Sequence, residues 1–302
     1  MKQAGKASNR ALPEDHWAFT DEKGSGRERY WGIGVVSGSA SALSALRQDL
    51  SGALGKLESL EWKDINGDSQ RQRAAQSYIE TAVAAVCKGV LRVDVLMWDT
   101  HDSRHAVQGR DDSQNVGRMY YHVLTHCGRM CGQRRWRLYP DDGSCLDWED
   151  IALYIRRTRV VRSKPYLISL FEEGGERFEI LEVSKQDSRK EPLVQLADIF
   201  VGMGCFSVDR SDKLKRWTEE QNRRSQLVLL PELDHAHDAQ SRSERARFEL
   251  VAGLNGLCKA TRLGVSLERR WHLWTPAPRA PINFWMYKPQ HDSDKAPTRR
   301  KG

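Results

Sequence analysis

The pattern of apolar and polar positions predicts short strands separated by amphipathic helices. Runs of β-branched and aromatic residues predict strands at 16–20, 29–37, 90–98, 135–139, 166–171, 178–183 and 282–287. Apolar residues at helical spacing predict helices at 41–57, 69–88, 113–130, 148–158 and 192–206, with Ser69 as the N-cap of the second. This mixed order predicts an α/β fold in which a mixed central sheet is flanked by helices on both faces.

The same pattern divides the chain into regions. We predict a flexible N-terminal arm at 1–14, an α/β core at 15–208, a charged helical insert at 209–275, a closing strand within 276–289 and a disordered polar tail at 290–302. Within the insert, 211–224 and 239–247 are predicted as solvated helices, and 248–257 is apolar enough to dock on a core.

Composition narrows the class of protein. Of 302 residues, 39% are hydrophobic and ten are tryptophan, which is typical of a chain with a packed core. The net charge of +7 suits a polyanionic partner such as nucleic acid, although an ordinary surface also explains it. With no apolar run of about 20 residues and no signal-peptide pattern, the expected location is the cytoplasm.

The six cysteines are scattered, as expected for free thiols of a cytosolic protein. A zinc site is a minor alternative. His122, His126, Cys127 and Cys131 could share a helix face, but structural zinc sites more often use tighter Cys-x2-Cys spacing.

Several carboxylates lie where predicted strands or helices begin or end. Asp21 closes the first predicted strand, with Glu22 pointing to the opposite face, and the pair Asp141 and Asp142 follows the strand at 135–139. Asp198 interrupts an apolar helix, where a buried carboxylate is costly unless it is paired or bound to metal. Each acid alone has an ordinary explanation, such as a turn or, for Glu61, a surface ion pair with Lys63.

Together, these acids form a series of short motifs. The order Asp21-Glu22-x-Gly, Glu61-x-Lys63, Ser184-Lys185 and a late helix with Gln195-x-Ala-Asp198 resembles the bacterial family catalogued as "domain of unknown function 3800". Two positions depart from the family's pattern. Lys23 stands where serine is usual, and Trp62 precedes Lys63, where the family's tryptophan more often follows the lysine.

The resemblance implies a ribonuclease H-like fold over roughly 16–206 plus the last strand, and a metal-dependent nuclease, often encoded near phage-defence or mobile elements. It implies that Asp21, Asp198 and either Asp141 or Asp142 hold two Mg²⁺ or Mn²⁺ ions, with Glu61 orienting metal or water. Two-metal hydrolysis of a phosphodiester requires such a set of carboxylates from separate elements.

Candidate substrate contacts are Lys63, Gln195, which shares a helix face with Asp198, and the basic residues Arg104 and Arg135. The charged region 209–247 is a candidate docking surface for a protein partner. The leading hypothesis is therefore a metal-dependent nuclease. Alternatives are a non-catalytic nucleic-acid-binding or interaction module on the same fold and, with less support, a hydrolase of a small phosphorylated molecule.

Overall fold

The computed structural model describes residues 15–24, 28–102, 112–131, 135–144, 146–157, 159–160, 176–177, 179–227 and 241–289. The expected N-terminal arm, the polar tail, the strand at 166–171 and Arg104 lie outside these residues. The strands are β1 His16–Lys23, β2 Tyr30–Ser39, β3 Arg92–Asp99, β4 Arg135–Pro140, β5 Arg159–Val160, β6 Glu176–Arg177, β7 Glu179–Val183 and β8 Ile282–Met286. The helices are α1 Ala40–Leu54, the 3-10 turn η1 Trp62–Asp64, α2 Ser69–Cys87, α3 Asp112–Cys131, α4 Trp148–Arg157, α5 Pro192–Asp209, α6 Ser211–Leu227 and α7 Arg242–Ala260.

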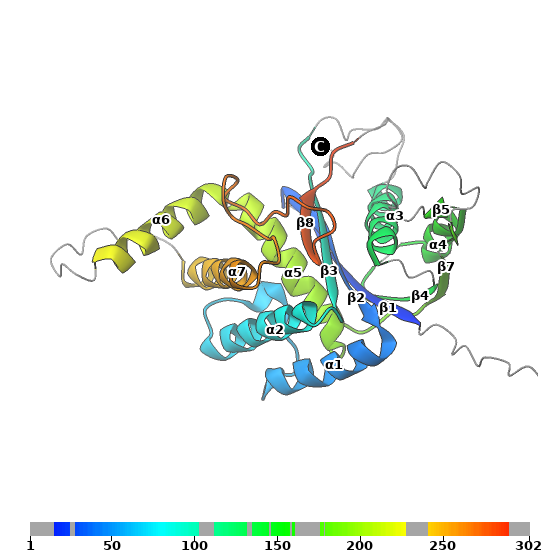
Figure 1. Cartoon of the computed structure of the whole chain (residues 1–302), viewed down its shortest axis with the longest axis horizontal. Coiled ribbons are helices and arrows are strands. Elements are labelled where there is room, and N and C mark those ends of the chain that lie inside the picture. The colour runs from blue at the N-terminus through cyan, green and yellow to red at the C-terminus, as the bar shows by residue number, and fades with distance from the viewer. Residues whose placement is uncertain are drawn as a thin grey trace, which may run out of the picture.

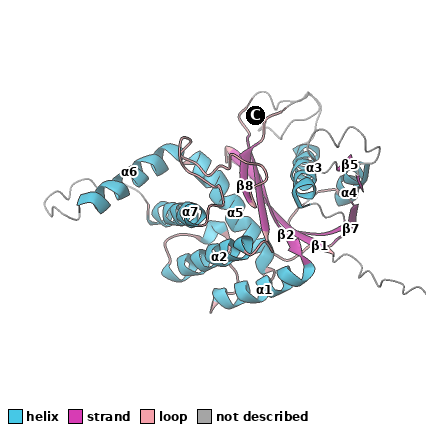
Figure 2. Cartoon of the chain, in the orientation of Figure 1, coloured by secondary structure: helices cyan, strands magenta, loops and turns pink. Residues whose placement is uncertain are grey.

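A mixed six-stranded sheet forms the centre of the fold, with strand order β7-β4-β1-β2-β3-β8. β1, β2 and β3 form an antiparallel meander, whereas β4 pairs parallel to β1, β7 parallel to β4, and β8 parallel to β3. β5 and β6 form a separate two-stranded sheet. The prediction of a mixed α/β sheet flanked by helices is therefore confirmed (Figure 2).

Helices cover both faces of the sheet (Figure 1). On one side, α1, α2, α5 and α7 share a large apolar core with the sheet, and on the other α3 and α4 form a smaller core with it. Coverage on both sides explains why β2 and β3 are apolar along almost their whole length, because neither strand has a solvated face.

The central helix α5 crosses β1, β2 and β3 on the larger side. Two glycines of β2 make this contact possible, because a Cβ atom at Gly34 would lie 2.5 Å from the carbonyl oxygen of Ala197, and one at Gly32 2.9 Å from the sulfur of Cys205. α5 is long and apolar enough to cross a membrane, but 78% of it is buried within the fold. Its apolar character is thus that of a core helix.

Two local predictions were wrong. The N-cap of α2 is Asp68 and not Ser69, because the Asp68 carboxylate accepts the backbone N–H groups of Gln70 and Arg71. The described residues of the segments predicted at 239–247 and 248–257 belong to one continuous helix, α7, which begins at Arg242 and is capped by Ser241.

α7 is not a solvated helix. Phe248 and Leu254 of α7 are fully buried and belong to the larger core, and Ala246 is 3% exposed. The helix contacts α2, α5 and α6. The C-terminal region therefore packs onto the same core as the first helices of the chain.

Candidate active site

Asp21 and Asp141 lie on neighbouring parallel strands. Thr20 of β1 is in register with Pro140 of β4, and the N–H of Asp141 donates to the carbonyl oxygen of Thr20 at 3.0 Å. Phe19 and Tyr139, two residues earlier on each strand, stack on the larger side of the sheet with ring centroids 4.7 Å apart. Because side chains alternate along a strand, Asp21 and Asp141 project to that same side.

Asp21 is not the last residue of its strand, as the sequence had suggested. β1 continues to Lys23, and Asp21 pairs in register with Gly34 of β2. The strand extends because β2 is long enough to pair with it through Gly32. The acid therefore lies inside a strand with a ladder partner on β2, and not in a turn.

The third acid, Asp198, comes from α5. It follows Ala197, whose carbonyl oxygen faces the Cβ position of Gly34, so the close contact between helix and sheet lies directly beside Asp21. The Asp198 carboxylate accepts the backbone N–H of Trp62 at 2.5 Å. Asp198 thus joins the sheet face to the η1 turn.

η1 also carries Glu61 to the site. Glu61 immediately precedes η1, and its charge acts on Asp198, raising the pKa of that carboxyl. Glu61 also accepts an ion pair from Lys63 at 2.5 Å, and the Lys63 side chain is 73% exposed. The Trp62 ring packs where a Cβ atom on Gly202 would otherwise lie, 2.2 Å from the ring, so glycine one turn after Asp198 admits the tryptophan.

The acids of the cluster have raised pKa values. Burial raises the pKa of Asp21 to about 9, and the charges of Asp198 and Asp141 contribute to the increase. Burial also raises the pKa of Asp198 to about 6, opposed by the hydrogen bond from Trp62 and by the positive charge of Lys23. Like charges that share a buried site favour the uptake of a proton or a cation.

Asp141 and Asp142 differ clearly in their surroundings. Asp141 Oδ2 accepts the N–H of Gly143 at 3.2 Å, whereas its Oδ1 is buried and has no hydrogen-bond partner among the described residues. Asp142 is exposed in the following turn. The charge of Asp141, and not that of Asp142, acts on Asp21. The structure therefore brings Asp141 into the cluster.

Glu22 lies on the other side of the sheet, as its alternation with Asp21 predicted. Its carboxylate accepts the hydroxyl of the buried Tyr120 of α3 at 2.5 Å. Burial raises the pKa of Glu22, and the positive charge of Lys185 opposes that increase. Lys185 donates to the carbonyl oxygen of Ser144 at 2.8 Å, so the Ser184-Lys185 motif reaches the end of β4 beside the acids.

Gln195 does not face the acids. It is 1% exposed, and its amide oxygen accepts the Leu60 N–H and the Tyr78 hydroxyl. Its amide nitrogen donates to the carbonyl oxygens of Ser188 and Arg189. An amide has two donor hydrogens and two acceptor lone pairs, so no capacity is left for a substrate. The predicted role in substrate binding is replaced by a structural one.

Arg135 is also remote from the cluster. It is exposed at the first residue of β4, whereas Asp141 follows the last residue of that strand. A strand of this length places the two residues about 20 Å apart. Sequence proximity to a tryptophan and other arginines could not reveal at which end of the strand Arg135 lies.

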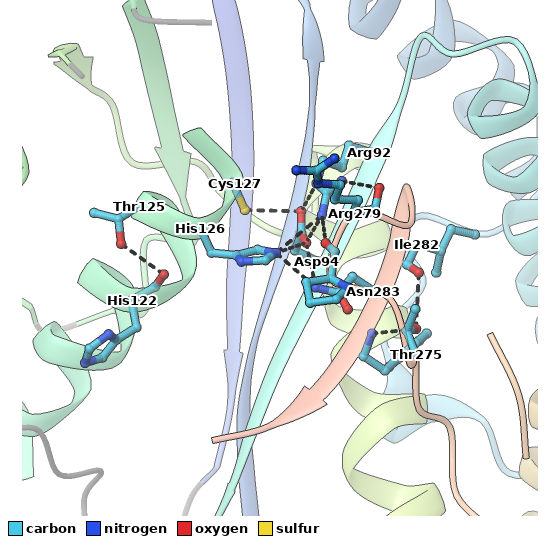
Figure 3. A network of polar contacts seen from close by, with 12 residues as sticks. Arg92, Asp94, His122, Thr125, His126, Cys127, Thr275, Arg279, Ile282 and Asn283 are labelled. Atoms are coloured by element: carbon cyan, nitrogen blue, oxygen red, sulfur yellow. Dashed lines mark hydrogen bonds and ion pairs between the residues drawn. The ribbon is translucent and has the colours of Figure 1, made fainter. Parts of the chain in front are cut away.

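The residues of the zinc alternative already have partners within the protein. Cys127 donates to the buried Asp94 carboxylate at 3.2 Å, His126 contacts Asn283 at 3.1 Å, and the His122 ring packs on Tyr287. Figure 3 shows the contacts of Cys127, His126 and Asn283 around Asp94, which Arg92 neutralises. Among the described residues, no group of three or more His, Cys, Asp or Glu side chains is arranged to hold a metal ion.

One basic residue near the acids was missed by the sequence reasoning. Arg247 of α7 donates to the carbonyl oxygens of Trp62 and Lys63 at 3.4 and 3.1 Å. It belongs to the region expected to be a solvated insert, and no motif marks it. The only signal in the sequence is its position on a helix with an apolar face.

The fold and the site define an α/β protein with an acidic cluster assembled on one face of its sheet. Comparison with known sequences then gives its family. The proteins named "Uncharacterized protein ORF2" and "Uncharacterized protein ORF2'" of Methanothermobacter thermautotrophicus are each 35% identical to this chain over 294 residues, which span 94% of this chain and 98% of the relative. The chain belongs to the same family as these two proteins. No family model matches it.

Proposed function

We propose that this protein is a metal-dependent nuclease of the cytoplasm, with a ribonuclease H-like fold, that hydrolyses phosphodiester bonds of DNA or RNA. One observation carries the proposal. Asp21 comes from a strand, Asp141 from the end of the neighbouring parallel strand and Asp198 from the helix that crosses the first of these strands, and the charges of Asp141 and Asp198 act on Asp21. A first-strand acid, an acid after a central strand and a late-helix acid are the set that the family resemblance implies.

Although the described residues do not form a preassembled group of three or more metal ligands, the carboxylate chemistry of the acids suits Mg²⁺ or Mn²⁺. Both are hard cations that prefer carboxylate oxygens and retain several water molecules. The buried Asp141 Oδ1 lacks a hydrogen-bond partner among the described residues, and burial together with two neighbouring negative charges raises the pKa of Asp21. A divalent cation would give the Asp141 oxygen a partner and would favour the charged form of Asp21. When bound, two such ions would activate water and stabilise the charge that develops on the phosphate.

The chain's own residues then have distinct roles. The charges of both other acids act on Asp21, so Asp21 would be the central metal ligand of the site, and Asp141 and Asp198 would be the other two ligands. Glu61 lies beside Asp198 and would orient metal-bound water. The exposed ammonium group of Lys63 remains a candidate phosphate contact. The net charge of +7 would favour the approach of a polyanion.

The test is cleavage of labelled single- and double-stranded DNA and RNA by purified protein with Mn²⁺, with Mg²⁺ or with EDTA. We expect metal-dependent cleavage that Asp21→Asn and Asp198→Asn reduce by at least about a thousandfold, since each removes a charged ligand. Asp142→Asn is the matched control, because Asp142 is the exposed neighbour of Asp141, and it should retain activity.

Other outcomes lead to other conclusions. Equal trace cleavage by the wild type and both variants would refute the nuclease proposal. Nucleic-acid binding that needs neither metal nor the acids would instead favour a non-catalytic binding module. Hydrolysis of a small phosphate ester, without cleavage of any polymer, would favour a hydrolase of small phosphorylated molecules.

A further inference from the structure

α7 holds the η1 turn from the side opposite to the acids. One nitrogen of the Arg247 guanidinium donates to the carbonyl oxygens of Lys63 and Trp62 at 3.1 and 3.4 Å. One turn earlier on α7, the Ser243 hydroxyl donates to the carbonyl oxygen of Ile65 at 3.0 Å. Three carbonyl groups at or next to η1, those of Trp62, Lys63 and Ile65, are therefore bound by side chains of a single helix.

Aromatic contacts strengthen this attachment. The Arg247 guanidinium lies 5.4 Å from the centre of the Trp62 ring and 5.8 Å from the centre of the Phe206 ring, and these two rings pack edge to face. A guanidinium over an aromatic face is attracted to the negative face of the ring, and the attraction grows when the group is partly desolvated. Arg247 therefore contacts the η1 turn through the Trp62 ring as well as through the backbone carbonyl groups.

The same turn holds Asp198 through its other edge. The Trp62 N–H donates to the Asp198 carboxylate at 2.5 Å, while the Trp62 carbonyl accepts from Arg247. A single residue thus connects the α7 arginine to the α5 acid. Figure 1 shows α7 lying beside α5 on the larger side of the sheet.

The charges around Asp198 come from three elements. Glu61 immediately precedes η1, Lys63 lies within it, and Lys23 belongs to β1. From α7, the Arg247 guanidinium is near enough for the negative charges of Asp198 and Glu28 to favour its charged form, which burial disfavours. Arg247 therefore combines a geometric contact with the turn and a charge that complements the acid.

We infer that Arg247 is a positioning residue for this site: by fixing the η1 turn it fixes the N–H donor that orients the Asp198 carboxylate. The inference deepens the proposed function and rests on it where metal binding is concerned. It assigns α7 a role that its sequence did not suggest. An outer residue that orients a metal ligand typically changes metal affinity or activity by 10-fold to 100-fold when it is removed.

The first experiment needs no activity. Hydrogen exchange of the Trp62 amide is measured in the wild type, Arg247→Ala, Arg247→Lys and Asp198→Asn. We expect Arg247→Ala to accelerate exchange of this amide by at least about 10-fold, with a similar increase in Asp198→Asn, which weakens the acceptor itself. Arg247→Lys retains a donor and should lie in between. Arg245→Ala is the matched control, since Arg245 is exposed on α7 and pairs with Glu249 one turn later on the same helix.

The second experiment measures Mn²⁺ affinity by calorimetry, and kcat and KM for cleavage, with the same variants. Arg247→Ala should weaken Mn²⁺ binding by about 10-fold to 100-fold and lower kcat more than it raises KM, with partial rescue in Arg247→Lys. If Arg247→Ala matches Arg245→Ala in amide exchange, or accelerates exchange equally throughout α2 and α7, the positioning role is refuted. If the wild type neither binds Mn²⁺ nor cleaves, the proposed function fails, while the exchange result still decides the role of Arg247.

Discussion

Replacing Asp21 with asparagine should stabilise the metal-free protein, and the gain should depend on pH in a defined direction. In the unfolded chain Asp21 ionises near its ordinary pKa of 3.8, whereas burial and the neighbouring charges of Asp198 and Asp141 raise its pKa to about 9 in the folded protein. Between these values the folded state binds more protons than the unfolded state. The free energy of unfolding of the wild type therefore decreases as pH rises through this window.

The magnitude follows from the same pKa values. A pH of 7 lies about three units above the pKa of Asp21 in the unfolded chain, and each unit corresponds to about 1.4 kcal/mol. Asp21 therefore lowers the free energy of unfolding at pH 7 by at most about 4 kcal/mol. Because three carboxylates share the available protons, we expect about 2–4 kcal/mol. Asparagine keeps the acceptor for the Glu22 N–H, which Asp21 Oδ1 binds at 2.7 Å, and removes the charge.

The assay is urea denaturation of the wild type and Asp21→Asn at several pH values in EDTA. The difference in the free energy of unfolding should be near zero at pH 4, increase through neutrality and level off above about pH 9. Asp142→Asn should show no such trend, because Asp142 is exposed. A difference that is constant between pH 4 and 9, or that favours the wild type as pH rises, would refute the buried acidic cluster. Added Mn²⁺ should stabilise the wild type and not the variant.

Two further substitutions test the scaffold of the site. Gly34→Ala should lower the free energy of unfolding in urea by about 1–3 kcal/mol, because the new Cβ atom would lie 2.5 Å from the carbonyl oxygen of Ala197. The control Gly52→Ala lies in open space on α1 and should raise the free energy of unfolding by about 0.5–1 kcal/mol. Equal effects of the two substitutions would contradict the close contact between α5 and β2. Gln195→Leu should lower the free energy of unfolding by about 2–4 kcal/mol and leave KM for cleavage unchanged, because all four hydrogen bonds of the amide are made within the protein. A raised KM without a loss of stability would instead support the predicted role of Gln195 in substrate binding.

Periodicity predicted most of the described elements, because strands and helices buried on a defined face carry strong repeating patterns. The strand at 90–98 and the helix at 192–206 were found within three residues of their observed ends. The predicted start of a helix was wrong where two adjacent polar residues could both serve as the N-cap, as with Asp68 and Ser69 at the start of α2. Both side chains can cap a helix, and only the backbone geometry distinguishes them.

The site was partly predictable for a similar reason. Asp21 and Asp198 stood out because each interrupts or ends an apolar run, and such a placement carries information without any three-dimensional contact. The choice between Asp141 and Asp142 required the register of β4 against β1, which is a long-range property. Gln195 looked similar to Asp198 in the sequence, but its amide completes a buried network with Tyr78 and Leu60.

The acidic cluster is difficult to explain by the stability of the fold. Asp21 occupies a partly buried strand position at which desolvation and the charges of two neighbouring acids oppose its ionisation, so an apolar or amide side chain there would stabilise the metal-free protein. Around the acids, the chain provides the features needed to hold them in place: Gly34 admits α5, Gly202 admits Trp62, and the Trp62 N–H binds Asp198. A costly group that is held this firmly is typical of a functional site. The compensation we propose is a divalent cation, which would convert the repulsion among the acids into binding affinity.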